Sequence, residues 1–403
     1  MRLASVTAIA AGLILSNVAM SADSAMSLRT EGNDEEYNLH LDQALSRFRQ
    51  AVLADPNDSA SYRAVAGVSM LRIAFERGAV TMDEFLDGAT DATNVDVAKP
   101  TAALAEVFRA NAERAFQLAD ARVRAHPDDA DAHYQLAAAV GLQASYSATV
   151  EGQVFAAFKH ARRAYQESRR TLELDPSRED AGLILGLYQY ILSLRSLPVR
   201  WFGKIGGIGN DRAKGIALIE AAARYPGETQ TDARLALVLI YNRERRFDDA
   251  LTMLSALQTR YPDNRLLAFE AGSTMLRANR FQAAERAFDR GLATLAGPLT
   301  LRAFGEEALW RYKHGTALAG LNRDVEANRE LQFVVQHDAR DWVHGRAHAE
   351  LGKLAERAGD RITAREEFRA AAQLAKTAGD PGGRADAERL LNTPILQTAK
   401  TSP

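Results

Sequence analysis

The chain has 403 residues, 50 of them lysine or arginine and 52 aspartate or glutamate, and it contains no cysteine. Near-zero net charge, with basic and acidic residues interleaved, argues against a nucleic-acid-binding surface. The lack of cysteine excludes disulfides, thiolate metal sites and lipid attachment at a cysteine in this chain. Alanine, leucine, arginine and glutamate dominate, and no long stretch alternates with period two, so the composition predicts an all-α protein.

The first predicted element is a signal peptide over residues 1–22. Arg2 precedes an apolar run over 3–15, and the small residues Ala19, Ser21 and Ala22 follow. An uncleaved membrane anchor is the alternative, but Ser16 interrupts the run well before the roughly 20 residues that a membrane span needs. We therefore expect the mature chain to start near Ala22 or at the next residue, and the protein to be periplasmic or secreted.

A repeat organises the rest of the chain. Ala250 and Leu254 return 34 residues later as Ala284 and Phe288. One helix pair of this size cannot bury its own apolar stripe, so neighbouring pairs must stack, with small residues allowing close approach. The later copies of the pair are Ala327 with Leu331 and Ala364 with Phe368, and the preceding glycines are Gly272, Gly315 and Gly352.

This pattern resembles the tetratricopeptide repeat family over about residues 28–378. The resemblance implies an α-solenoid of about eight helix pairs forming a right-handed superhelix, in which the first helix of each pair lines a concave groove. We expect a single solenoid domain over 23–392. Its parts are degenerate repeats over 28–226, regular repeats over 231–378 and a capping helix at about 383–392, and a disordered tail follows over 393–403.

Three insertions lengthen the early repeats, at 78–100, 142–156 and 195–210. The spacing places each insertion at the turn between the two helices of a repeat. Equivalent turns line up along one edge of a solenoid, so the insertions predict a single elaborated edge that binds a partner. Tolerated variation in loop length is the competing interpretation.

The segment 195–210 mixes aromatic, aliphatic and basic residues with proline and four glycines. Residues 195–218 resemble a motif in a eukaryotic tetratricopeptide family of mitochondrial outer-membrane and inclusion-body-clearance proteins, except that Asn210 interrupts the Gly-Asp-Arg sequence. The segment could fold back as a plug that buries Trp201 and Phe202, or it could rest on a membrane surface as an amphipathic foot. It has neither a phosphate-loop nor a dinucleotide-binding glycine pattern.

The sequence contains no complete catalytic or metal-binding pattern. His344 and His348 stand four residues apart, but the catalytic His-Glu-x-x-His pattern is absent because Gly345 follows the first histidine. The acidic residues 34–36 are predicted to form a solvated helix face. We therefore predict no enzymatic activity, no cofactor and no bound metal.

The repeat register predicts which residues face the concave groove, and the middle of this groove is apolar and aromatic. Family members that clamp an acidic chaperone tail carry lysine and asparagine or arginine where this chain has Leu235, Leu239 and Phe269, so that activity is not expected. The register also places Ala138, Gly141 and Leu183 on the groove.

We expect an exported scaffold that binds a protein or peptide partner in this groove, and no nucleic acid. A membrane-surface adaptor is the alternative, and the sequence does not indicate an oligomeric state. The expected partner-binding residues are Tyr134, Leu187, Tyr190, Leu235, Leu239, Asn242, Phe269, Tyr312, Trp201 and Phe202.

Overall fold

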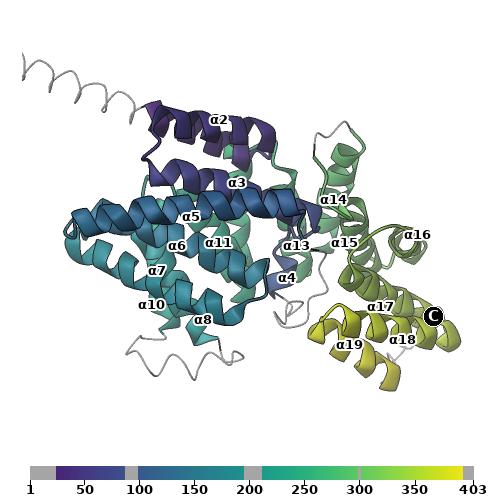
Figure 1. The fold of residues 1–403 in the computed structure, drawn as a ribbon. Coiled ribbons are helices and arrows are strands. Elements are labelled where there is room, and N and C mark those ends of the chain that lie inside the picture. Colours follow the sequence, from purple (N-terminus) through teal and green to yellow (C-terminus); the bar gives the residue numbers. More distant parts are fainter. Residues whose placement is uncertain (1–23, 87–98, 195–210, 298–300, 394–403) are drawn as a thin grey trace, which may run out of the picture. The chain divides into compact units, whose positions relative to one another are not determined.

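The computed structural model describes residues 24–86, 99–194, 211–297 and 301–393, and all regular structure within these ranges is helical (Figure 1). The predicted all-α fold class is therefore confirmed. Within the same ranges, every helix is too short or too polar to cross a lipid bilayer.

The chain divides into two compact units, the first comprising residues up to 73 and 101–234, and the second comprising 74–100 and 235 onward. The prediction of one continuous solenoid domain stays a prediction. The first unit contains helix 24–37, α2 (Leu41–Ala54), α3 (Ser59–Glu76), α5 (Ala102–Ala125), α6 (Ala130–Thr149), α7 (Val154–Leu174), the 3-10 turn η1 (Glu179–Ala181), α8 (Gly182–Ser193) and α10 (Arg212–Arg224).

The second unit contains the short helix α4 (Asp83–Leu86) and most of α11 (Gln230–Arg243), which begins in the first unit. The helices that follow pack one on the next along the chain. They are α12 (Phe247–Arg260), α13 (Arg265–Arg277), α14 (Phe281–Leu295), α15 (Glu306–Gly320), α16 (Asp324–Gln336), α17 (Asp341–Arg357), α18 (Arg361–Thr377) and α19 (Pro381–Asn392), which lies where the capping helix was predicted.

The predicted repeat register is visible as one packing contact that recurs. A Cβ atom added to Gly272 would lie 2.8 Å from the ring of Phe288, closer than real Cβ atoms approach a neighbour, so glycine lets the two helices meet. The glycine's partner is sixteen residues further along the chain in every copy. The equivalent pairs are Gly32 with Phe48, Gly315 with Leu331 and Gly352 with Phe368.

Aromatic rings form the centre of the second unit. Phe269, Phe288 and Trp310 are completely buried and pack edge to face, with ring centroids 5.1 to 6.1 Å apart. The indole of Trp310 lies directly over Gly291, where an added Cβ would be 1.8 Å from the ring. Such pairs stabilise a core beyond the area that they bury.

The insertion predicted at 142–156 is largely helical and does not form a long loop. Its first residues continue α6 to Thr149, and its last residues begin α7 at Val154, so both helices exceed those of the regular repeats in length. The added residues therefore lie on both sides of the turn between α6 and α7 and lengthen the two helices. The insertions at 142–156 and 78–86 belong to different units, and 195–210 lies outside the described residues, so the shared binding edge stays a prediction.

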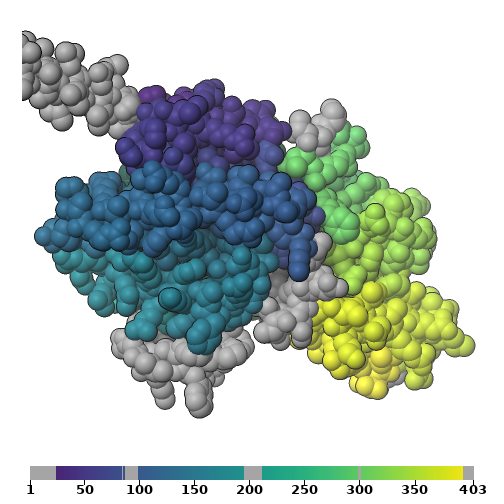
Figure 2. Space-filling view, viewed as in Figure 1, coloured from purple at the N-terminus to yellow at the C-terminus, as the bar shows by residue number. Residues whose placement is uncertain are grey.

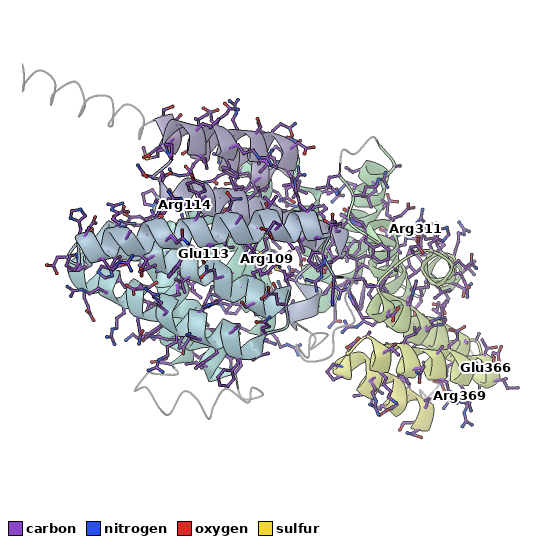
Figure 3. The ribbon with its side chains drawn as sticks, viewed as in Figure 1. Arg109, Glu113, Arg114, Arg311, Glu366 and Arg369 are labelled. Atoms are coloured by element: carbon purple, nitrogen blue, oxygen red, sulfur yellow. The ribbon has the colours of Figure 1, made fainter. Side chains whose placement is uncertain are left out.

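The outer surface of α5 is a solvated helix face. This helix crosses the side of the first unit seen in Figure 2. Arg109, Glu113 and Arg114 project from it in Figure 3, and all three are exposed. The opposite side of α5 carries Phe108 and Ala112, which are buried against α3. The charged face therefore keeps α5 amphipathic, as a helix on the outside of a repeat stack requires.

Candidate functional site

The first unit contains a pocket with a volume of about 390 Å³. Its walls come from helix 24–37, α3, α6, α8 and residues 228–232. These helices are the first members of successive pairs, so the pocket lies on the face that the repeat register predicts to be concave. Its volume falls within the range of about 300–1,000 Å³ that is usual for ligand pockets.

One wall of the pocket is apolar. Ala138, Gly141, Leu183 and Leu187, which the register placed on the groove, all line it. Gly67 on α3 also faces the pocket, and a Cβ atom added there would meet no atom within 4 Å. The small residue at this position leaves open space that a larger side chain would fill.

Two arginines line the pocket, and both are already paired. Arg29 Nη2 donates to Glu228 Oε1 at 3.0 Å, and its other terminal nitrogen pairs with Asp58. Arg63 Nη2 donates to Glu228 Oε2 at 2.6 Å, and Nη1 donates to the Gln135 side chain at 2.6 Å. Burial alone would raise the pKa of Glu228, but Arg63 and Arg29 outweigh it and lower that pKa.

Two further carboxyl groups line the same pocket, and neither forms an ion pair with a described residue. Asp232 accepts a hydrogen bond from the Tyr37 hydroxyl at 2.7 Å, and within the described residues it forms no ion pair. The carboxyl group of Glu36 forms neither a hydrogen bond nor an ion pair with any described residue. Burial, with a smaller contribution from the charge of Asp232, raises the pKa of Glu36 to about 8.

These charged residues were not predicted as a site. Glu36 was predicted to lie on a solvated helix face. That prediction is wrong for this residue, because Glu36 lines the pocket while its neighbour Glu35 pairs with His40 outside it. Helical periodicity in the sequence could have placed Glu36 beside the other pocket residues of its helix. Arg29, Asn33 and Glu36 recur at spacings of four and three residues, which places them on one side of the helix.

The other predicted partner-binding residues have varied surroundings. Tyr134 and Tyr190 are buried in the first unit, and Leu235 and Leu239 are half-buried. Phe269 is completely buried, and Asn242, whose amide donates to Val238 O and Thr274 Oγ1, is also buried. Tyr312 is buried too and packs edge to face on Trp342.

Asn242, Phe269 and Tyr312 therefore pack within the second unit in this structure. Partner contact at the predicted positions stays a prediction. Trp201 and Phe202 lie outside the described residues, as do the plug and the membrane foot proposed for their segment.

Within the second unit, residues 79–86 lie against α11, α13 and α15. Met82 N donates to Glu270 Oε1 at 2.8 Å, and Arg243 Nη2 donates to the backbone oxygen of Phe85 at 3.1 Å. The Asp83 side chain is completely buried, and its carboxylate pairs with Arg277 and with Lys313 Nζ, the latter at 2.9 Å. Part of the insertion predicted at 78–100 thus covers the first helices of this unit's repeats.

Burial and the neighbouring cations act in opposite directions on the pKa of Asp83. Burial alone would raise the pKa of Asp83, but the charges of Lys313 and Arg277 outweigh it and hold that pKa well below its ordinary value. Burial and the charge of Asp83 both raise the pKa of Glu270. The cations therefore keep Asp83 ionised, and Glu270 is the group of the pair that more readily holds a proton.

His344 and His348 do not converge on a common point. His344 Nε2 lies 2.9 Å from the backbone oxygen of His337, whereas His348 Nδ1 lies 2.6 Å from Glu367 Oε2. Within the described ranges, no group of three or more histidine or acidic residues has the arrangement of a metal site.

No model of a known protein family matches the sequence, and no curated protein is significantly similar to it. Similar solved structures include yeast Tom70, which is 13% identical with a TM-score of 0.41, the match covering 91% of this chain and 95% of that chain. A human IFIT1 dimer with m7Gppp-AAAA is 12% identical with a TM-score of 0.46, covering 92% of this chain and 85% of that chain.

A tetratricopeptide repeat protein from Parabacteroides merdae is 10% identical with a TM-score of 0.34, and the match covers 82% of this chain and 99% of that chain. At these identities the likeness concerns the fold alone. The recurring contact between glycine and a large apolar residue in this chain's own helix pairs confirms the predicted resemblance to the tetratricopeptide repeat family.

Proposed function

We propose that this chain is a non-enzymatic scaffold that holds a peptide segment of a partner protein in the pocket of the first unit. The observation that carries the proposal is the pocket itself, whose lining comes from successive repeats and joins an apolar wall to charged groups. A peptide that runs along successive repeats contacts all of these walls. Its apolar side chains would bury area on Leu183 and Leu187, and its polar groups would meet the charged side.

Gly67 provides a direct test. We expect Gly67→Leu to fill the pocket while the helix remains intact, because the added side chain meets open space and leucine favours a helix more than glycine does. Gly67→Ala is the matched control, since it makes the same backbone change with little added volume. The measurement is affinity for peptides selected by the wild-type protein from a random-sequence phage library.

The selected peptides should bind the alanine variant about as tightly as they bind the wild type. They should bind the leucine variant at least tenfold more weakly. Equal binding to all three proteins would place the peptide site elsewhere. Circular dichroism and a thermal melt establish that both variants are folded.

We further propose that the protein is exported through the segment 1–22. The support is the order of one early cation, an apolar run and small residues in the sequence. N-terminal sequencing of the protein recovered from a periplasmic fraction should show a chain that begins near Ala22 or at the next residue. Recovery of only the intact Met1 species, in membranes, would contradict cleavage and favour an anchor.

A further inference from the structure

We infer that the pocket selects a cationic side chain, a lysine or arginine of the partner segment. Its charged end would lie beside Glu36 and Asp232, and its aliphatic part would lie along the wall formed by Leu183 and Leu187. This inference rests on the proposed function, because it names the chemistry that the same pocket recognises. The preference for a cation follows from the charged groups of the pocket and from the ion pairs that the described residues form there.

The pocket holds more carboxyl groups than cations. Arg29 and Arg63 are the lining cations, and both use Glu228, with Asp58 as the second carboxylate of Arg29. After these pairs are made, neither Glu36 nor Asp232 forms an ion pair with a described residue. The charge of Arg63, which already pairs with Glu228, acts on Asp232 from beyond ion-pair distance. The acidic groups left over carry negative charge when they are ionised, which for Glu36 requires a pH near or above 8.

An anionic ligand would have to displace a carboxylate from an arginine, which would leave that carboxylate half-buried and unpaired. A cationic ligand displaces nothing and gives the two unmatched acids a partner. A purely apolar ligand would cover the same wall, but it would remove Glu36 and Asp232 further from water without compensation. Charge compensation therefore favours the cation over both alternatives.

The apolar wall favours a cation that also has an aliphatic part over a small inorganic cation. Lysine and arginine carry three or four methylene groups below the charged end, and such chains lie along apolar surface while the charge meets a polar group. Ala138 and Gly141 add no bulk beside the two leucines, so an extended aliphatic chain has room there. A small inorganic cation would leave this wall uncovered.

Binding should also depend on pH in a defined direction. The groups around Glu36 are Arg29, Arg63, Glu228, Asp232 and Tyr37, all lining the pocket, together with Asp58 beside Arg29. With a pKa of about 8, Glu36 is mostly protonated at pH 6 and ionised at pH 9. A lysine ligand stays cationic up to about pH 10. It binds the ionised form, so affinity should rise with pH by up to about tenfold per unit below pH 8.

The test uses three short acetylated and amidated peptides of alternating alanine and leucine that differ only at the central residue. That residue is lysine, norleucine or glutamate, and affinity is measured by titration calorimetry at pH 6 and pH 8.5. We expect the lysine peptide to bind at least tenfold more tightly than the other two at pH 8.5. We also expect its advantage to shrink at pH 6.

Two variants assign the preference to the pocket. Glu36→Gln should abolish the pH dependence and most of the lysine preference, whereas Glu35→Gln should leave both unchanged because Glu35 pairs with His40 outside the pocket. If all three peptides bind equally and Gly67→Leu abolishes their binding, the cation preference is wrong and the proposed function stands. If peptides bind and Gly67→Leu has no effect, the proposed function itself fails.

Discussion

Truncation of Phe288 to alanine should lower the free energy of unfolding of the second unit by about 3–5 kcal/mol. The side chain is completely buried, contacts Phe269 and Trp310 edge to face, and fills the space left by the missing side chain of Gly272. Its removal loses both the transfer of a large ring from water and the contacts that a cavity cannot replace. Denaturant unfolding followed by tryptophan fluorescence measures the loss.

A second substitution tests the contact itself. Gly272→Ala should destabilise the wild type, because the added methyl group would lie 2.8 Å from the Phe288 ring. In the Phe288→Ala background the same substitution should cost much less or restore stability, since the methyl group then enters a cavity. Phe155, which is 77% exposed, supplies the control, and its replacement by alanine should change stability by less than about 0.5 kcal/mol.

Equal costs of Gly272→Ala in both backgrounds would show that residues 272 and 288 do not touch. The repeat register would then be wrong at this pair, and the assignment of first and second helices in the regular repeats would need to be revised.

The repeat core was predictable because its signal is local and periodic. Gly272, Gly315 and Gly352 each precede a large apolar residue by a constant number of positions, and that spacing is fixed by the length of one helix and its turn. The four groove positions at Ala138, Gly141, Leu183 and Leu187 follow from the same register. Once the glycine of a helix pair is identified, the helical period therefore predicts which residues of that pair face the core and which face the groove.

The charged side of the pocket was not predictable in this way. Glu36 and Asp232 are almost two hundred positions apart in the sequence, and no short motif connects them. Residues 34–36 form an acidic run, which is usually a solvated surface. Only the packing of helix 24–37 beside the start of α11 turns Glu36 into a pocket residue and Glu35 into a surface residue. The contacts of Asp83 depend on tertiary packing in the same way.

Replacement of Asp83 by asparagine should lower the free energy of unfolding of the second unit by about 3–5 kcal/mol. Asparagine keeps the size of the side chain, so the loss reflects charge and not a cavity. Arg277 and Lys313 would lose the carboxylate that both contact at a fully buried position. Residues 79–86 should then separate from α13 and α15, since the Asp83 pairs hold the segment to both helices. The Met82 amide still donates to Glu270 on α13, and the Phe85 oxygen still accepts from Arg243 on α11.

Hydrogen exchange at Met82 reports this separation directly, because its amide donates to Glu270 in the closed arrangement. Exchange should accelerate in the Asp83→Asn variant. Asp42→Asn is the control, since Asp42 pairs with Arg72 but its side chain is 85% exposed, and it should cost less than about 1 kcal/mol. If the two variants lose equal stability and Met82 exchange does not change, the Asp83 charge cluster does not hold the segment.

The pH dependence of this contact has a definite sign. Because the pKa of Asp83 is lowered by folding, its stabilisation is present above the ordinary aspartate pKa of about 3.9 and is lost as pH falls through the lower folded value. Glu270 has the opposite sign, since its raised pKa makes its contribution largest at acidic pH and reduces it as pH rises. Asp83→Asn removes the charge that helps to raise the pKa of Glu270. The variant should therefore lose stability less steeply than the wild type as pH rises toward neutrality, in addition to being less stable than the wild type above a pH of about 4.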